Sequence, residues 1–163
     1  MIKGMKWWLN TDIKVEGELP SKDKVVIYAI KHQSAWETVF CTDFFSMPSI
    51  VLKKALIFLP VIGLYFLRSG AIPITRDQGI NALKKMGRNA KIAVKKNRSM
   101  MIFPQGTRVS PGVSPKEQPY LPGVFFLSSQ TKVPVVPLAH HAGLLCPNNS
   151  FIMSPERLSS NPA

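Results

Sequence analysis

Four short, almost continuously apolar runs constrain the fold more than any other feature of this sequence. They are Val25–Ile30, Ala71–Thr75, Met100–Pro104 and Val133–Ala139. Runs of this length without strict alternation are typical of strands that are covered on both faces. Longer segments with helical patterns lie between them, and strands that alternate with helices indicate a layered domain. We therefore expect an α/β fold in which a mostly buried mixed sheet is flanked by helices.

Two of the intervening segments carry helix signals. Ser34-Ala35-Trp36-Glu37 has the S-x-x-E spacing of a capping box, and the apolar residues that follow predict a helix that begins near Ser34. Gly79–Lys96 has an apolar face opposite a basic stripe, which predicts an amphipathic helix. The expected inner face contains Ile80, Leu83, Gly87, Ala90 and Val94, and the basic stripe contains Lys84, Arg88, Lys91 and Lys95.

The length and charge of the chain limit its organisation and its partners. With 163 residues and 45% apolar content it can form one domain with its own core, and we expect a single domain over residues 1–163. The 21 Lys and Arg against 9 Asp and Glu leave a net charge of +12, which favours a negatively charged partner. Nucleic acid, an anionic membrane surface and phosphorylated substrates all meet this condition.

The most hydrophobic stretch, Ala55–Leu67, predicts either a buried segment or one that lies in a membrane interface. It is shorter than the run of about 18 apolar residues that crosses a bilayer, and Pro60 and Gly63 interrupt it. The first ten residues lack the apolar run and the cleavage site of a signal peptide, so we expect the protein on the cytoplasmic side.

Cysteines and histidines give no metal pattern. Cys41 and Cys146 stand far apart without a CxxC spacing, so neither a disulfide framework nor a zinc site is predicted. His140 and His141 are adjacent, and adjacent residues of a strand point to opposite faces, so they are not expected to share a metal. We assign these two histidines no catalytic role.

His32 is the candidate catalytic base. It follows a buried-type strand and comes two residues before a helix start, with Glu37 in the first turn. A neutral imidazole, whose ordinary pKa is about 6.5, is suited to take the proton of an attacking alcohol. A nearby carboxylate would fix the tautomer of the ring and stabilise the imidazolium. The same residues also allow a structural interpretation, in which Glu37 completes the capping box and His32 only lies in a turn.

Two arginines form a candidate phosphate site. Arg76 follows the run AIPIT, and Arg108 ends the segment FPQGTR, again just beyond a predicted strand. Two guanidinium groups suit a phosphate, with Gly106 allowing a tight turn and Thr107 offering a hydroxyl. Each arginine alone fits an ordinary surface charge, but open α/β sheets bind ligands at strand ends, where His32 also lies.

The segments KHQSAWET, GAIPITR, FPQGTR and VPVVPLAH occur in this order and resemble the four sequence blocks of the glycerolipid acyltransferase superfamily. They are most similar to bacterial 1-acyl-sn-glycerol-3-phosphate acyltransferases, and the match runs from Lys14 to Asn149. The resemblance implies a glycerol-3-phosphate acyltransferase-like fold. It also implies transfer of a fatty acyl group from acyl-CoA or acyl carrier protein to the free hydroxyl of 1-acyl-glycerol-3-phosphate, giving phosphatidic acid without a cofactor.

The resemblance assigns roles to individual residues. The implied site comprises the base His32, its partner carboxylate Glu37, and the substrate-binding residues Arg76, Gln105, Gly106, Thr107, Arg108 and Pro137. Two positions depart from the family pattern, which usually has Asp at position 37 and Glu at position 105. Glu37 keeps the charge with one extra methylene, whereas Gln105 keeps hydrogen-bonding capacity but loses a charge.

The resemblance also implies partners and a location. The expected partners are lysophosphatidic acid, an acyl thioester, an anionic membrane surface and acyl carrier protein, with no nucleic acid. The expected location is the cytoplasmic face of the inner (plasma) membrane, as a peripheral or monotopic protein. Family members commonly carry a hydrophobic N-terminal region and further strands after the fourth block, so we expect this chain to be truncated at both ends.

Other functions stay open on the residues alone. The acceptor can be another lysophospholipid. A hydrolase would need an activated nucleophile, and the chain has no G-x-S-x-G elbow and no Cys beside a His. A nucleic-acid-binding module is the non-enzymatic alternative, because seven of the 21 basic residues fall between Lys84 and Arg98. No helix-turn-helix, RNP-type or zinc-finger pattern accompanies them, and a basic face also suits an anionic membrane.

Overall fold

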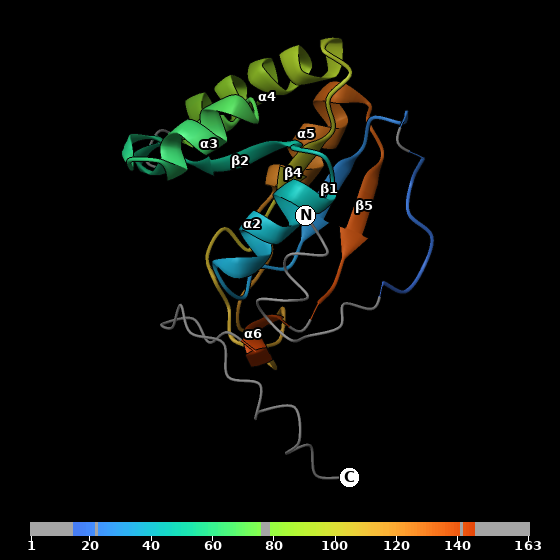
Figure 1. The fold of residues 1–163 in the computed structure, drawn as a ribbon, viewed down its shortest axis with the longest axis vertical. Helices are drawn as coiled ribbons and strands as arrows, with labels where there is room; N and C mark the ends of the chain where they lie inside the picture. The colour runs from blue at the N-terminus through green and yellow to red at the C-terminus, as the bar shows by residue number, and fades with distance from the viewer. Residues whose placement is uncertain (1–14, 22, 76–78, 141, 146–163) are drawn as a thin grey trace, which may run out of the picture.

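A five-stranded sheet organises the computed structural model, which describes residues 15–21, 23–75, 79–140 and 142–145 (Figure 1). The strands lie in the order β3-β2-β4-β1-β5. Their bounds are β1 Ile27–Ile30, β2 Ser49–Lys53, β3 Ile72–Ile74, β4 Met100–Ile102 and β5 Val135–Leu138. The predicted α/β class is confirmed, and each of the four apolar runs contains a strand.

Every described pairing in this sheet is parallel, so the expectation of a mixed sheet is wrong for the described residues. The reason is that each connection between successive strands contains a helix, which returns the chain to the edge of the sheet where the previous strand began. The helical segments are α2 Trp36–Phe44, the 3-10 helix η1 Lys54–Phe58, α3 Ile62–Arg68, α4 Gly79–Lys95, α5 Gly123–Thr131 and the short α6 Ala142–Leu145.

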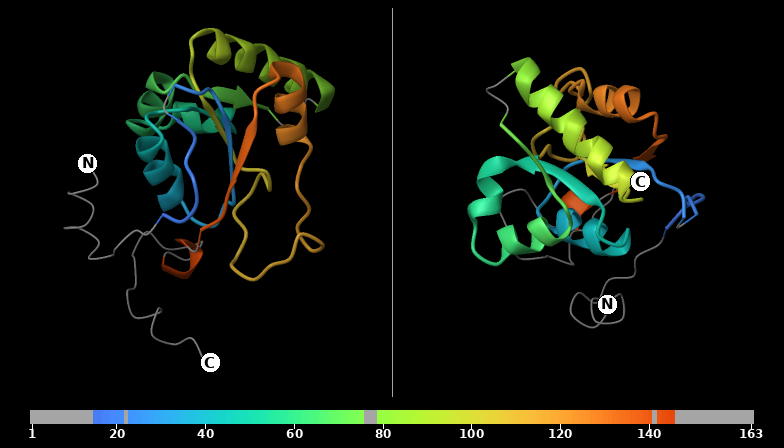
Figure 2. Two further views of the ribbon diagram at one scale, coloured as in Figure 1. Left: turned by 90° about the vertical axis from the view of Figure 1, so that its right-hand side faces the viewer. Right: turned by 90° about the horizontal axis from the view of Figure 1, so that it is seen from above.

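Helices cover both faces of the sheet (Figure 2). On one face, Met86 of α4 and Leu127 of α5 pack with Ile27 of β1 in a buried cluster. On the other face, Cys41 of α2 and Phe66 of α3 pack with strand residues of a second cluster. Because both faces are covered, the strands are mostly apolar, and β1 is buried at all four positions.

The amphipathic helix α4 follows the prediction closely, with one exception. Its buried residues include Met86, Gly87 and Ala90, while Lys84, Arg88 and Lys91 are exposed. Ile80 was expected on the inner face but is 71% exposed, because the helix turns its buried stripe toward Ala82 and Met86 instead. No helix or strand occurs between Ile102 and Gly123, so β4 is followed by a long loop.

The hydrophobic stretch 55–67 forms η1 and most of α3, and it exposes much of its apolar surface. Phe58 is 76% exposed, Val61 83% and Leu64 60%, whereas Gly63 and Phe66 are the buried residues of α3. We call this surface on η1 and α3 the apolar patch. Among the described residues, no helix has the length and apolar character needed to cross a membrane.

Gly63 allows the corner between η1 and α3 to close. A Cβ atom at this position would lie 1.9 Å from the carbonyl oxygen of Ile57, so the backbone would have to move. Gly63→Ala is expected to lower the free energy of unfolding by about 1–3 kcal/mol, measured by urea denaturation. Leu64→Ala, at an exposed position of the same helix, should change it by less than about 0.5 kcal/mol. Equal effects of the two substitutions would contradict this account of the corner.

Candidate active site

His32 and Glu37 form a hydrogen-bonded pair at the carboxyl end of β1. The Nδ1 atom of His32 lies 2.7 Å from Oε1 of Glu37, which is in the first turn of α2. The imidazole also stacks on the ring of Phe103, with 4.1 Å between ring centroids and 22° between planes. Phe103 directly follows β4, the neighbour of β1 in the sheet. The first turn of α2 and the residue that follows β4 therefore both contact the imidazole.

The Glu37 carboxylate is buried and receives several hydrogen bonds. Its side chain is 1% exposed. The backbone N–H groups of Gln33 and Ser34 donate to Oε1 at 2.9 Å each, and Ser34 N–H and Oγ donate to Oε2 at 2.8 and 2.7 Å. Each of these donors suits an ionised carboxylate, which has only acceptor sites. These hydrogen bonds thus hold the carboxylate in place and favour its ionised form.

This arrangement differs from the predicted capping box. In the structure, α2 begins at Trp36 with Ala35 as its N-cap residue, which makes no side-chain capping hydrogen bond. Glu37 does accept from the Ser34 backbone, as in a capping box, but the Ser34 hydroxyl donates to the same carboxylate. Glu37 therefore joins the helix start to His32 instead of only capping the helix.

The hydrogen bonds of Glu37 determine the tautomer of His32. An ionised carboxylate can only accept, so in neutral His32 the proton lies on Nδ1. The Nε2 atom then carries the free lone pair, which is the arrangement that a general base requires. The His32 side chain is 17% exposed, so the ring is shielded without being closed off from solvent.

Burial and hydrogen bonding act in opposite directions on Glu37. Burial raises the pKa of this carboxyl, but hydrogen bonds from His32, Ser34 and Gln33 together outweigh burial, and the pKa lies below its ordinary value of 4.5. The neighbouring Cys41 is buried, and burial together with the charge of Glu37 raises the pKa of its thiol to about 12. Cys41 is therefore an inert thiol beside the site, and Cys146 lies outside the described residues.

Gln105 contacts the backbone of the candidate base. Its side chain is buried, with 4% of its surface exposed, and Oε1 accepts a hydrogen bond of 3.0 Å from the backbone N–H of His32. The next hydrogen bond in this region runs from the N–H of Val109 to the carbonyl of His32 at 2.8 Å. The loop that follows β4 therefore holds both backbone polar groups of His32.

The segment after β5 holds the residues on either side of His32. Nδ1 of His140 accepts from the N–H of Ala142 at 3.2 Å, so its Nε2–H donates to the carbonyl of Lys31. The N–H of Gly143 donates to Oε1 of Gln33 at 3.1 Å. Sequence reasoning gave His140 no role, and no local pattern indicates these contacts, which join residues about 110 positions apart.

The predicted phosphate-binding residues lie partly within the described structure. Gly106 occupies a turn with a φ of 69°, a conformation that favours glycine, and Thr107 and Arg108 are exposed on the loop that Val109 ties to His32. The structure thus brings the Gly106–Arg108 turn to the same end of the sheet as His32. Arg76 lies outside the described residues.

Pro137 occupies a different position from the other predicted residues. It lies in the edge strand β5 opposite Ala29 of β1, and it is exposed. An edge strand accommodates proline because one side of it needs no ladder hydrogen bond. No described cluster of three or more His, Cys, Asp or Glu side chains is arranged to hold a metal ion.

Comparison with known proteins places the chain in a family. The acyltransferase family model matches residues 12–141. The chain is 35% identical over 137 residues to a 1-acyl-sn-glycerol-3-phosphate acyltransferase of Pseudomonas aeruginosa, covering 84% of this chain and 51% of the relative. It is 29% identical over 153 residues to the enzyme of the same name from Saccharomyces cerevisiae, covering 93% of this chain and 48% of the relative.

A solved structure has the same fold. The crystal structure of the 1-acyl-sn-glycerophosphate acyltransferase PlsC from Thermotoga maritima aligns with a TM-score of 0.73 and 23% identity, covering 93% of this chain and 60% of that one. This chain spans about half the length of the curated relatives it matches. With the fold, the paired His32 and Glu37, and the family match in agreement, the chain belongs to the acyltransferase family.

The lowered pKa of Glu37 predicts a pH dependence of stability. A carboxyl whose pKa is depressed in the folded state stabilises the fold above its unfolded value and loses this contribution as pH falls through the folded value. The free energy of unfolding of the wild-type protein is therefore expected to fall below pH 4.5 more steeply than that of Glu37→Gln. At neutral pH, Glu37→Gln should be less stable by about 1–3 kcal/mol, because an amide N–H group then faces other donors.

Urea denaturation at a series of pH values measures both effects, and all other carboxylates are shared by the two proteins. Parallel pH profiles for the wild-type protein and Glu37→Gln would show that this carboxyl is not held in its ionised form.

Proposed function

We propose that this protein transfers a fatty acyl group from an acyl thioester to the free hydroxyl of 1-acyl-glycerol-3-phosphate, giving phosphatidic acid. The observation that carries the proposal is the His32–Glu37 pair, with 2.7 Å between Nδ1 and Oε1, at a strand end of an acyltransferase-family fold. Two curated relatives that match most of this chain are named for the same acyl transfer. Acyl-CoA and acyl carrier protein are the two candidate donors, and the reaction requires no further cofactor.

The geometry of the pair supports direct transfer with general-base catalysis. Nε2 of His32 accepts the proton of the acceptor hydroxyl while the hydroxyl oxygen attacks the thioester carbonyl. Glu37 stabilises the imidazolium that forms, and the tetrahedral intermediate then collapses with loss of the thiolate. The imidazolium returns the proton to the thiolate, so the base is regenerated. No covalent acyl-enzyme is needed, and holding both substrates in position supplies the remaining advantage.

Arg76 and Arg108, with the Gly106-Thr107 turn, are proposed to bind the phosphate of the acceptor. A backbone hydrogen bond from the N–H of Val109 to the carbonyl of His32 already holds the loop of Arg108 beside the base. A phosphate at this turn would lie at the same end of the sheet as the base, which suits an acceptor whose phosphate and reacting hydroxyl belong to one small glycerol unit.

The apolar patch is proposed to dock on the cytoplasmic face of the plasma membrane as a peripheral contact. Exposed Phe58, Val61 and Leu64 would enter the boundary between headgroups and acyl chains. The exposed side chains of Lys53 and Lys54 stand next to the patch and would pair with anionic headgroups. The patch follows the carboxyl end of β2, so the membrane would lie on the side of the sheet toward which the strands point.

Replacing the base tests the proposal most simply. His32→Ala is expected to lower kcat for acyl transfer by about 10²–10⁴-fold, the usual contribution of general-base catalysis, without loss of the fold. Glu37→Gln should retain the fold and lose most activity, because its amide cannot stabilise an imidazolium by charge. Product formation is measured by mass spectrometry with a panel of lysolipids. Wild-type rates in His32→Ala would remove the mechanism, and another lysophospholipid as the sole acceptor would correct the substrate.

Replacing the arginines tests the phosphate site. Arg108→Ala and Arg76→Ala are each expected to raise KM for lysophosphatidate, through loss of charge-assisted hydrogen bonds of about 1.5–3 kcal/mol, more than KM for the acyl donor. Lysine at either position should restore binding only in part, because it lacks the planar fork of arginine. Lys116→Ala is the matched control, since this exposed cation lies on the same loop as Arg108. Equal changes for both substrates would count against phosphate binding.

A further inference from the structure

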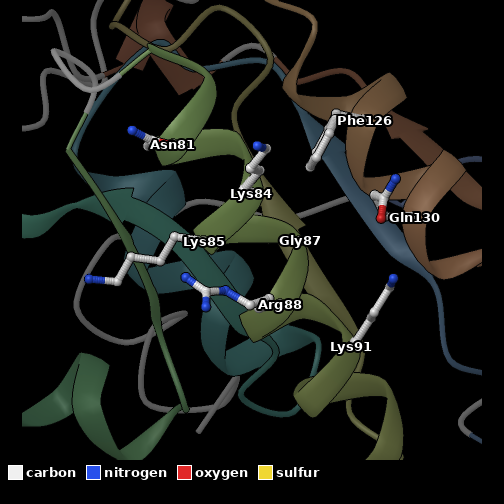
Figure 3. Close-up of a pocket in the computed structure, with 8 residues that line it drawn as sticks. All are labelled: Asn81, Lys84, Lys85, Gly87, Arg88, Lys91, Phe126 and Gln130. Atoms are coloured by element: carbon white, nitrogen blue, oxygen red, sulfur yellow. The ribbon is translucent and has the colours of Figure 1, made fainter.

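A basic groove runs between α4 and α5, away from the His32 site (Figure 3). Its volume is about 730 Å³. The groove is defined by four cations on α4 and two residues on α5, namely Lys84, Lys85, Arg88, Lys91, Phe126 and Gln130. Nothing in the mechanism proposed above uses these residues.

The cations of the groove have no acidic partner in the described structure. No acidic residue occurs in the sequence between Asp77 and Glu117. Within the described ranges, the recorded ion pair is that of His32 with Glu37, and all four groove cations are exposed. An unpaired cluster of four positive charges produces a local field that attracts an acidic surface.

The floor of the groove is apolar and suits close contact with a helix of a partner protein. Gly87 faces Phe126, and a Cβ atom at Gly87 would lie 3.0 Å from the Phe126 ring, so the two helices approach closely there. Phe126 is half-buried, and the adjacent Phe125 is 78% exposed. An apolar floor with a charged rim between two helices is the form that accepts an amphipathic helix.

The position of the groove argues against a membrane as its occupant. Met86 of α4 packs into the core on one face of the sheet, whereas Phe66 of α3 packs on the opposite face. The apolar patch and the groove therefore belong to opposite layers of the molecule (Figure 2). A flat bilayer that contacts the apolar patch therefore does not also contact the groove. The groove faces away from that bilayer and is accessible to a protein partner.

The groove is also connected with the site through the core. Met86 lies beneath the groove and packs with Ile102 of β4 in the same buried cluster. Ile102 directly precedes Phe103, whose ring stacks on His32. The helix that lines the groove therefore packs through the core against the strand that precedes Phe103.

We propose that the basic groove docks an acidic amphipathic helix of the carrier protein that delivers the acyl thioester. This inference rests on the proposed function and adds to it the surface that recognises the donor. The acidic side of the helix pairs with Lys84, Arg88 and Lys91, and its apolar side contacts Phe126. Binding is steered by charge, so it weakens as salt is added.

A donor comparison tests this proposal. The triple variant Lys84→Glu/Arg88→Glu/Lys91→Glu is assayed with acyl carrier protein and with acyl-CoA carrying the same acyl chain. KM for the acyl carrier protein is expected to rise about tenfold or more, and KM for acyl-CoA to stay within about twofold. Titration of fluorescently labelled carrier protein into the wild-type and variant proteins measures the same loss without turnover, and urea denaturation confirms that the variant is folded.

Lys53→Glu/Lys54→Glu is the matched control, because it reverses two exposed charges beside the apolar patch and none in the groove. It is expected to weaken binding to anionic vesicles of phosphatidylglycerol and to leave carrier-protein binding unchanged. The triple variant should show the opposite pattern.

Several results would overturn the docking proposal. These are unchanged carrier-protein binding in the triple variant, equal losses with both donors, loss of vesicle binding instead, or preferential binding of duplex DNA. A wild-type protein that binds carrier protein through the groove but transfers no acyl group from any donor would instead refute the proposed function and leave the docking surface intact.

Discussion

The rest of the site depends on the hydrogen bonds that the Glu37 carboxylate accepts. It is buried, and it accepts hydrogen bonds from the Gln33 and Ser34 backbone, from the Ser34 hydroxyl and from the His32 ring. These donors fix the turn between β1 and α2 and keep the carboxylate ionised although burial opposes the charge. An ionised Glu37 in turn leaves Nε2 of His32 as the nitrogen that can accept a proton. The same carboxylate therefore determines both the conformation of this turn and the tautomer of His32.

The parallel sheet brings other segments of the chain next to that turn. Because β1, β4 and β5 run in the same direction, the segments that follow them meet at one edge. Gln105 and Val109, which follow β4, bind the backbone of His32, and His140, which follows β5, binds the carbonyl of Lys31. His32 is thus held through its side chain by α2 and through its backbone by the segment after β4, while the segment after β5 holds the residues next to it. Such support from separate elements is what the proposed catalytic role of His32 requires.

Local patterns in the sequence predicted much of this arrangement, and the failures have physical reasons. The runs that became β1, β3, β4 and β5 were predicted because they are apolar and bounded by polar or turn residues. Strand β2 was missed because Ser49–Lys53 lies close to the apolar stretch that follows it in the sequence. Helix α5 was missed because the first turns of Gly123–Thr131 are apolar on nearly every side, so they show no amphipathic pattern. The contacts of Gln105 and His140 join residues 73 and 109 positions apart, so no local pattern contains them.

The tautomer of His32 is the most direct measure of the central claim that Glu37 prepares this ring as a base. The chain has three histidines, so nitrogen-15 NMR of the imidazole groups can be assigned by comparison with His32→Ala. The account predicts that neutral His32 carries its proton on Nδ1 in the wild-type protein, and that this preference is lost or reduced in Glu37→Gln. A wild-type His32 protonated on Nε2, or a tautomer unaffected by Glu37→Gln, would contradict it.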